Sequence, residues 1–277
     1  RFNAATADGE PLSMIPRSSD GQLLFLLNNI SKMKQDTPLG SRIVEVHNGS
    51  SLFTGDAGSG ESNARRYMIE NDLVEAIIAL PEKMFYNTGI GTFIWVLSNR
   101  KEERRKGKIQ LIDATAIKTP LRKNMGEKNC ELSPAQRQEI VRIFMAFEES
   151  EVSRIFPNSE FGYWKVSVQQ PLLDEQGNPA LDKKGRIQPD KAKADTEIIP
   201  FRYEGGIEAF MDAEVRPYAP GAYIDPKATK IGYELSFTKY FYKPVQLRSM
   251  EDIVADLKAL EKETDGMLAE ILGGIQG

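Results

Sequence analysis

Two adjacent aromatic residues, Phe85 and Tyr86, stand where residue type and spacing suggest a ligand site. They follow a nearly continuous apolar run, residues 73–81, on the side where open α/β sheets bind their ligands. Asn87 and the Thr-Gly pair after it tolerate the tight backbone of a turn. An aromatic face held there can stack on an unstacked base, a contact worth roughly 1–3 kcal/mol. Packing in the core is the alternative for the two rings.

The sequence contains one histidine, His47, and one cysteine, Cys130. One of each cannot form the common zinc sites, so no metal site is predicted. A Ser-His-Asp or Cys-His pair would have to use His47, which we interpret instead as a strand-end histidine with structural contacts. A single cysteine excludes an internal disulfide and suits a reducing cytoplasm, which is the predicted location.

The segment GDAGSGES, from Gly55 to Ser62, has the glycines and the final serine of a phosphate-binding P-loop. The lysine of that motif is replaced by Glu61. A carboxylate at this point would repel the phosphates that a lysine should hold, so nucleotide hydrolysis is disfavoured. We predict a flexible loop that leads into a helix and can close over a ligand.

A short run of positive charge occupies residues 100–108. It contains two glutamates and six cations: Arg100, Lys101, Arg104, Arg105, Lys106 and Lys108. A solvated link between edge strands is one interpretation. A local contact to DNA phosphates is the other, because a chain of net charge −4 cannot grip nucleic acid over its whole surface.

Hydrophobic spacing predicts an α/β arrangement for the first 115 residues. The expected order is helix, strand, helix and three further strands, at 20–34, 43–46, 61–72, 73–81, 92–98 and 109–114. Asp20 or Ser19 would cap the first helix, and Ser59 or Ser62 would lie near the start of the second. This order is that of the closing half of an open α/β sheet, with the last strands antiparallel at its edge.

The residues after 115 have a different character. Residues 133–150 predict a helix with a Ser133–Gln136 capping box and a buried stripe of Ile140, Ile143, Phe144 and Phe147. We then expect a strand, a polar and mobile hairpin or excursion, and a short helix, at 161–173, 174–195 and 205–218.

Residues 249–273 form the clearest predicted helix. Its seam residues step by three and four, as at the a and d positions of a coiled coil: Met250, Ile253, Leu257, Leu260, Thr264, Met267 and Ile271. Val254, Leu268 and Leu272 widen the seam towards packing in a bundle of several helices. The helix can pack on its own domain or dock on a partner, and its terminal place favours a partner.

Composition restricts the class of protein. The 277 residues, 40% hydrophobic and 27% charged, are typical of a globular protein with one large or two modest domains. No apolar run approaches the length of a membrane span, so no membrane partner is expected. The first residues lack the layout of a signal peptide and an initiating Met, which indicates a fragment or a processed product.

Several stretches carry a family resemblance: LLFLLNNISKMK, the continuous run from RIVEVHNGSS to FIWVLSNRK, and QLIDAT. They resemble the modification (M) subunits of type I restriction-modification systems, which are N6-adenine DNA methyltransferases. FGYWKVSV, DTEIIPF and IGYELSFTKYFYK are similar to the C-terminal region of that family. The resemblance is densest between residues 19 and 114.

The resemblance implies a Rossmann-like sheet that binds S-adenosylmethionine, with a helical tail behind it. Two family motifs are absent from this sequence: the Asp/Glu-x-x-x-Gly-x-Gly cofactor turn and the catalytic Asn-Pro-Pro-Phe. We therefore expect the C-terminal part of such a subunit, without catalytic residues of its own and inactive alone. Its regions would be the end of the methyltransferase domain, a helix-and-strand extension and a helical assembly tail, at 1–115, 116–204 and 205–277.

The resemblance also implies roles for single residues. It places Phe85, with Tyr86 and Asn87, where the family stacks on a flipped adenine, which makes core packing of the rings less favoured. A turn beside the pocket would be formed by Asn48, Gly49 and Ser50. The cations expected on the DNA backbone are Arg100, Lys101, Arg104, Arg105 and Lys106.

The partners implied are DNA, a specificity subunit docked on the a/d seam of residues 249–273, a restriction subunit and a second modification subunit. The alternative function is a non-catalytic assembly module that binds a specificity subunit. A small-molecule methyltransferase or a nucleotide enzyme is disfavoured by Glu61 and by the tail.

Overall fold

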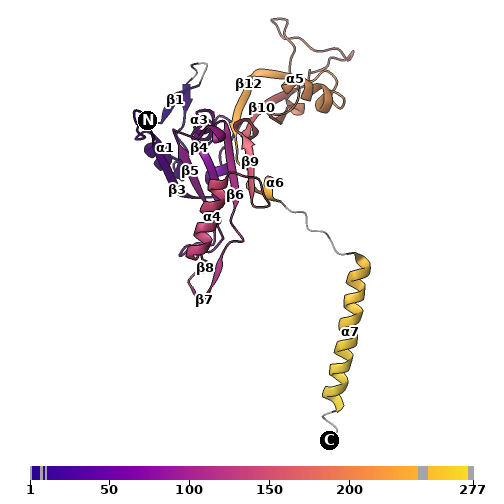
Figure 1. The fold of residues 1–277 in the computed structure, drawn as a ribbon. Coiled ribbons are helices and arrows are strands. Elements are labelled where there is room, and N and C mark those ends of the chain that lie inside the picture. Colours follow the sequence, from indigo (N-terminus) through magenta and orange to yellow (C-terminus); the bar gives the residue numbers. More distant parts are fainter. Residues whose placement is uncertain (1, 7–8, 10, 243–248, 274–277) are drawn as a thin grey trace. The chain divides into compact units, whose positions relative to one another are not determined.

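The computed structural model describes residues 2–6, 9, 11–242 and 249–273 (Figure 1). The chain forms two compact units, one that ends at Phe241 and one that begins at Tyr242. The region boundaries proposed at 115 and 204 fall inside the first unit. The fold is mixed α/β, as predicted.

A five-stranded sheet forms the centre of the first unit, in the order β3-β5-β4-β6-β9. Its strands are β3 (Arg42–Asn48), β4 (Val74–Ala79), β5 (Thr92–Ser98), β6 (Lys108–Asp113) and β9 (Ser153–Pro157). β4 and β6 are parallel, and the other pairs are antiparallel. The prediction of antiparallel last strands at the edge is wrong in two respects. β5 is antiparallel but lies inside the sheet, and β6 pairs parallel with β4, while β9 forms the edge.

The strand register brings four strand ends to one edge of this sheet. Asn48 lies opposite Thr92, and Ala79 lies beside both Phe93 and Asp113. The carboxyl ends of β3, β4 and β6 therefore meet the start of β5, and we call this the carboxyl edge. The opposite, amino edge holds the end of β5 and the start of β6, with the basic residues 100–108 between them.

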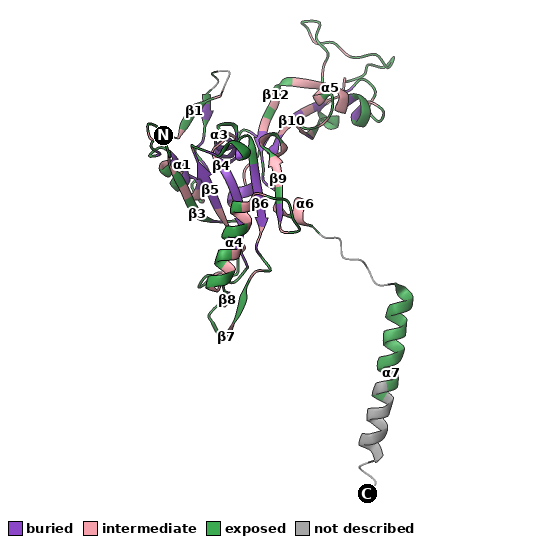
Figure 2. Ribbon diagram, viewed as in Figure 1, coloured by how far each residue is buried: buried purple, intermediate pink, exposed green. Residues whose placement is uncertain are grey.

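Helices cover both faces of the sheet. On one face, α1 (Gln22–Ile30) and α3 (Gly60–Glu70) pack against Ile77 and Trp95. On the other, α4 (Pro134–Ala146) packs Ile140 against Ile78. All six residues of β4 are buried, as the nearly continuous apolar run at 73–81 indicates for a strand covered on both faces (Figure 2). A buried Leu or Ile of this kind contributes about 1.5–3 kcal/mol.

The helix ends test the predicted caps. Ser59 caps α3 by accepting a bond from the Ser62 amide, and the capping box of Ser133 and Gln136 begins α4, as predicted. Gly21 caps α1, not Asp20 or Ser19, because the Asp20 carboxylate accepts bonds from Gln22 instead. A further helix, α2 (Ser50–Phe53), occupies residues that had been expected to begin a loop.

The stripe predicted for α4 is only partly buried. Ile140 is buried, whereas Ile143 and Phe144 are half-buried against the same cluster. Phe147 lies just beyond the helix as its C-cap, in the left-handed conformation with φ 53°.

A second, three-stranded antiparallel sheet follows. The predicted strand at 161–173 is confirmed as β10 (Gly162–Gln169), which lies between β11 (Asp195–Pro200) and β12 (Tyr223–Tyr233). The predicted helix at 205–218 is confirmed as α5 (Gly206–Phe210) and a π-helical turn, Met211–Val215. Residues 170–190 form consecutive turns joined by isolated bridges.

The buried cation Arg65 joins the second sheet to the helices that cover the first. The Arg65 guanidinium of α3 donates to the backbone oxygens of Tyr233 in β12, at 2.6 Å, and Ser51 in α2, at 3.1 Å. The side chain is fully buried, and burial lowers the pKa of Arg65 to about 10. The two carbonyls and the nearby negative charges of Glu234 and Glu61 offset part of the cost of desolvating this charge.

The remaining elements are short. The first unit also contains β1 (Asn3–Ala5), β2 (Pro11–Ser13), β7 (Thr119–Met125), β8 (Lys128–Glu131), α6 (Phe237–Phe241) and the 3₁₀ turns Glu103–Arg105, Asn158–Phe161 and Lys191–Lys193. β7 and β8 pair as a hairpin beyond β6.

The second unit contains one helix, α7 (Met250–Gly273), as predicted from the spacing. The Ser249 hydroxyl caps it by accepting a bond from the Asp252 amide at 3.0 Å. Met250, Ile253, Leu257 and Leu260 are exposed, while the Met267 and Ile271 side chains lie outside the described part. No helix in the described ranges has the length and apolarity to cross a membrane.

Candidate functional site

Residues 82–91, which we call the aromatic turn, join β4 to β5 at the carboxyl edge. Phe85 is 37% exposed and Tyr86 is 59% exposed, so neither ring packs in the core. Lys83 and Asn87 adopt left-handed backbone with φ 55° and 56°, which costs roughly 1–3 kcal/mol at Lys83 and is tolerated by the asparagine. Strained backbone that presents an exposed aromatic ring favours a ligand site over a structural connection.

The two rings have different surroundings. The Tyr86 hydroxyl lies 3.9 Å from Met125 Sδ, and Lys128 Nζ lies 5.2 Å from the centre of its ring. Both contacts come from the β7–β8 hairpin, so Tyr86 supports that hairpin. Within the described ranges, Phe85 has no ring or cation partner. The ring left available for stacking is therefore Phe85.

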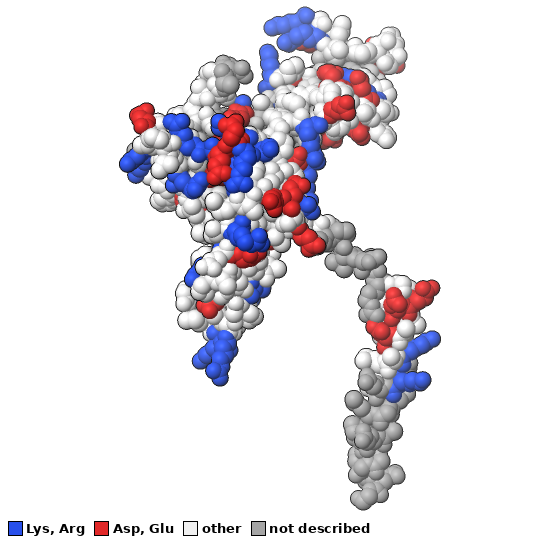
Figure 3. All heavy atoms as spheres, viewed as in Figure 1, with Lys and Arg blue, Asp and Glu red and all other residues white. Residues whose placement is uncertain are grey.

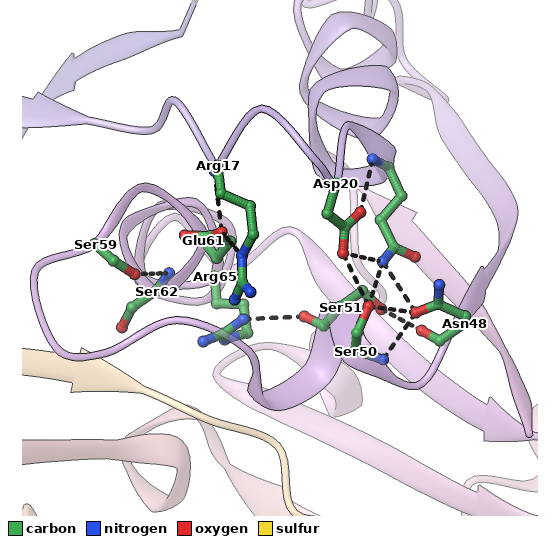
Figure 4. A network of polar contacts seen from close by, with 10 residues as sticks. Arg17, Asp20, Asn48, Ser50, Ser51, Ser59, Glu61, Ser62 and Arg65 are labelled. Atoms are coloured by element: carbon green, nitrogen blue, oxygen red, sulfur yellow. Dashed lines mark hydrogen bonds and ion pairs between the residues drawn. The ribbon is translucent and has the colours of Figure 1, made fainter.

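The turn after β3 lies next to the start of β5 at the same edge, and its polar groups bond to one another (Figure 4). Asn48 Oδ1 accepts bonds from the Ser50 amide at 2.8 Å and from Gln22 Nε2 at 3.0 Å. The Ser50 hydroxyl contacts Asn48 Oδ1 and Asp20 Oδ2, the latter at 2.9 Å. A Cβ on Gly49 would lie 3.1 Å from the Phe93 ring, which favours glycine there.

Asp20 and Gln22 are members of this network that the sequence did not reveal. Gln22 Nε2 bridges Asp20, Asn48 and Ser50, at 2.7–3.0 Å. Burial would raise the pKa of Asp20, but the bonds from Gln22 and Ser50 outweigh it and hold the pKa below its ordinary value. The network is thus a charged, rigid wall of the carboxyl edge.

Two further polar groups lie beneath this edge. Thr92 Oγ1 is buried and, among the described residues, has no hydrogen-bond partner, which is uncommon for a native hydroxyl. His47 is buried against Trp95, and its Nε2 lies 3.1 Å from Glu45 Oε1 in a geometry that makes no hydrogen bond. Burial lowers the pKa of His47 despite the carboxylates of Glu45 and Asp20. These contacts are structural.

The glycine-rich segment does not form a phosphate site. Glu61 is buried and accepts bonds from the Arg17 amide and Arg17 Nε, at 3.1 and 3.0 Å. A Cβ on Gly60 would lie 1.8 Å from the Ile15 carbonyl oxygen. The prediction of a loop able to close is therefore wrong for its second half, which packs tightly against residues 13–17.

Two cations of the basic link, residues 99–107, are buried. Lys101 is 8% exposed, and its Nζ lies 2.5 Å from Asp72 Oδ1 and 2.9 Å from the Lys108 carbonyl oxygen. Arg105 is 2% exposed, with its guanidinium 4.2 Å from the centre of the Phe144 ring. Burial lowers the pKa of both groups. Neither can reach a DNA phosphate, which corrects the prediction for this pair.

The link instead caps the end of α4. Arg105 donates to the Phe144 carbonyl, and Arg104 donates to the Met145 and Ala146 carbonyls, at 2.7 and 2.9 Å. Cations stabilise a helix C-terminus, and α4 has none in its own last turn. For the exposed Arg100, Arg104 and Lys106, contact with DNA stays a prediction, placed at the amino edge.

The site residues thus divide between two edges. The structure brings the aromatic turn and the Asn48–Ser50 turn to the carboxyl edge, and it leaves the basic link at the other. The described residues contain no group of three or more His, Cys, Asp or Glu side chains that could hold a metal ion.

We compared the sequence with models of known protein families. A model of the family described as N-6 DNA Methylase matches residues 4–166, more than half of the chain. The chain belongs to the N-6 DNA methylase family. The match includes the five-stranded sheet and the aromatic turn.

Curated proteins similar to this chain are methylase subunits of type I restriction enzymes. The type I restriction enzyme MjaVII methylase subunit of Methanocaldococcus jannaschii is 47% identical over 58 residues, 21% of this chain and 10% of the relative. The MjaIX methylase subunit of the same organism is 33% identical over 112 residues, 40% of this chain and 19% of the relative. The resemblance to type I modification subunits is confirmed. The chain spans between a tenth and a fifth of these relatives.

Solved structures of N-6 DNA methylases are also similar. A type I methyltransferase subunit from Streptococcus thermophilus aligns with TM-score 0.44 and 21% identity, over 52% of this chain and 28% of that one. A putative type I modification subunit from Vibrio vulnificus aligns with TM-score 0.42 and 15% identity, over 68% and 35%.

Proposed function

We propose that this chain is the C-terminal part of a type I modification subunit. The complete enzyme transfers a methyl group from S-adenosylmethionine to the N6 amine of an adenine turned out of the DNA duplex. The observation that carries the proposal is the exposed Phe85 ring, held by strained backbone at the carboxyl edge of the family-matched sheet.

Phe85 supplies what base extrusion requires. Removing a base from the stack costs a few kcal/mol, and a new aromatic stacking contact of roughly 1–3 kcal/mol offsets much of that cost. The exocyclic amine of adenine is a weak nucleophile, so its position for in-line attack on the methyl group matters more than acid–base assistance. Phe85 and the rigid Asn48–Ser50 turn would fix the plane of the base.

The described residues do not form a site for S-adenosylmethionine. Asp20, Gln22, Asn48 and Ser50 satisfy one another, and no glycine turn of the cofactor motif is present. We therefore derive no step through the cofactor from this chain. Its binding and the catalytic groups are assigned to the remainder of the subunit.

The open side of β3 supports that assignment. Among the described strands β3 pairs with β5 alone, and its Val44 and Val46 side chains are exposed. An unpaired edge strand with apolar side chains is a template for further strands. We propose that the remainder of a Rossmann-like sheet continues there, so that residues 1–115 complete the catalytic domain. Residues 116–204 are then its extension, and 205–277 form the assembly region.

The apolar seam of α7 supports assembly with a specificity subunit, within a complex that also holds a second modification subunit and a restriction subunit. Leu257→Asp with Leu260→Asp should weaken co-purification of the specificity subunit, because both side chains are exposed on one helix. Lys258→Asp is the matched control on the same turn. If the parental chain, the double variant and the control recover equal amounts of the specificity subunit, this role of α7 is contradicted. A pure assembly module is the alternative function, and the same seam would serve it.

The main experiment measures methyl transfer to duplex DNA by the complete subunit in its complex. Phe85→Ala should lower kcat/KM by roughly 5- to 150-fold, the equivalent of 1–3 kcal/mol of lost stacking. Phe25→Ala removes a phenyl ring on α1 that is even more exposed, 70% against 37% for Phe85, and it should leave kcat/KM unchanged. Both variants should keep the parental melting temperature. Undiminished transfer by Phe85→Ala would remove Phe85 from the site.

A further inference from the structure

The β7–β8 hairpin carries more positive than negative charge in an acidic chain. Residues 118–131 contain two glutamates and four cations, Lys118, Arg122, Lys123 and Lys128. Arg122 and Lys123 are exposed, and Figure 3 shows positive charge gathered at the free end of the hairpin. Across the described ranges neither forms an ion pair, whereas Arg104 and Lys106 of the basic link pair with glutamates.

The hairpin is irregular where these cations lie. Pro120 pairs with Cys130, but the next pair is Met125 with Lys128, so β7 takes five steps while β8 takes two. Arg122 and Lys123 lie in the excess length of β7. A bulge of this kind bends a strand and re-aims its side chains, and it leaves them outside the regular ladder.

The hairpin is fastened to the aromatic turn. The Asn129 amide donates to the Lys83 carbonyl at 3.0 Å, and the Cys130 thiol lies 3.3 Å from the Glu82 carbonyl oxygen. The contacts of Tyr86 with Met125 and Lys128 add to these bonds. The cations therefore have a defined position relative to Phe85.

We propose that the β7–β8 hairpin contacts DNA phosphates beside the extruded adenine, through Arg122 and Lys123. The inference rests on the proposed function of Phe85. When a base leaves the duplex, its strand keeps one negative charge per phosphate, and the unpaired cations of a hairpin fastened to the aromatic turn would hold that strand. The basic link lies across the sheet, about 20 Å away over strands of six or seven residues, and cannot hold the same phosphates.

The test measures the affinity of the complete subunit, in its complex, for a DNA duplex as a function of salt, from about 50 to 200 mM. Arg122→Gln with Lys123→Gln should reduce the slope of log K against log salt by about 2, since each phosphate contact contributes about 0.9. Lys32→Gln with Lys34→Gln removes two exposed cations after α1 and should leave the slope unchanged. Arg100→Gln with Lys106→Gln tests the basic link.

The outcomes separate the hypotheses. An unchanged slope for the hairpin variant overturns the proposal, as does an equal loss in the Lys32 and Lys34 control, which would report only bulk charge. A loss in the Arg100 and Lys106 variant alone assigns the contact to the basic link and also overturns it. Methyl transfer is measured on the same samples. If the hairpin variant shows the reduced slope but the parental complex transfers no methyl group, the hairpin contact is supported and the proposed function is contradicted.

Discussion

The aromatic turn and the basic link are two short connections of similar length in one sheet, and they use their conspicuous residues in opposite ways. The turn exposes two rings that its apolar character would be expected to bury. The link buries two cations that its charge would be expected to expose. A residue's hydrophobicity predicts its burial on average, so the informative positions are those that depart from it.

The two connections differ in burial because they pack against different elements. The link passes from β5 to β6, on the far side of β4, and meets the C-terminus of α4, where free carbonyls require donors. The turn passes from β4 to the adjacent β5 and meets only the hairpin. The link is therefore fixed by the fold, whereas the turn is free to serve a ligand.

The largest effect that would test this comparison is on stability. Arg105→Ala removes the donor to the Phe144 carbonyl and to Gln110 and uncovers two aromatic rings. The free energy of unfolding should fall by about 3 kcal/mol. Lys106→Ala, next to it and exposed, should change it by less than about 0.5 kcal/mol. Denaturant titration of both variants is the measurement, and similar small effects would show that the link is not structural.

A smaller, local effect is expected at the aromatic turn. Tyr86→Ala removes the ring that Lys128 contacts, an exposed cation–π interaction of about 0.5–1 kcal/mol. Hydrogen exchange at the Asn129 amide should become faster by the corresponding factor of roughly 2–5, with global stability nearly unchanged. Tyr86→Phe keeps the ring and is the control. If hydrogen exchange at the Asn129 amide is unaltered in Tyr86→Ala, Tyr86 does not stabilise the attachment of the hairpin to the aromatic turn.

The smallest effect is the pH dependence of the free energy of unfolding. It should arise from His47, which is the one histidine of the chain and lies beside the carboxyl edge. Burial lowers the pKa of His47 below its ordinary 6.5, so the folded state binds the proton less readily than the unfolded state. The contribution of His47 to the free energy of unfolding is therefore fully present above pH 6.5. It declines as the pH falls from 6.5 towards the pKa of His47 in the folded state. An imidazole NMR titration with a midpoint above 6.5 would contradict this sign, and His47→Gln should lack the decline.

The sequence predicted those elements whose signals are local. β4 is a continuous apolar run, and the capping box and Ser59 lie within four residues of the helices that they begin. The order of strands was not predictable in the same way. β9 pairs with β6 across some forty residues, and β7 and β8 are polar and short, so neither has a periodicity that separates it from a loop.

The sequence predicted only those site residues that are close together in the chain. Phe85 to Asn87 lie together in the chain, and their exposure and backbone agree with a ligand turn. Asp20 and Gln22 join the network from about thirty residues away in the chain, which no local pattern shows. Lys101 and Arg105 were misassigned because the sequence does not show which cations a helix end will cover.

The Arg65 bridge limits how this chain can be shortened. A product that stops before β12 would strip the guanidinium of its bond to the Tyr233 carbonyl, leaving a charged group inside apolar surroundings. The family match ends at residue 166, but a piece cut there would lose the same acceptor. Expression trials that aim at a minimal fold should therefore retain everything through Leu235.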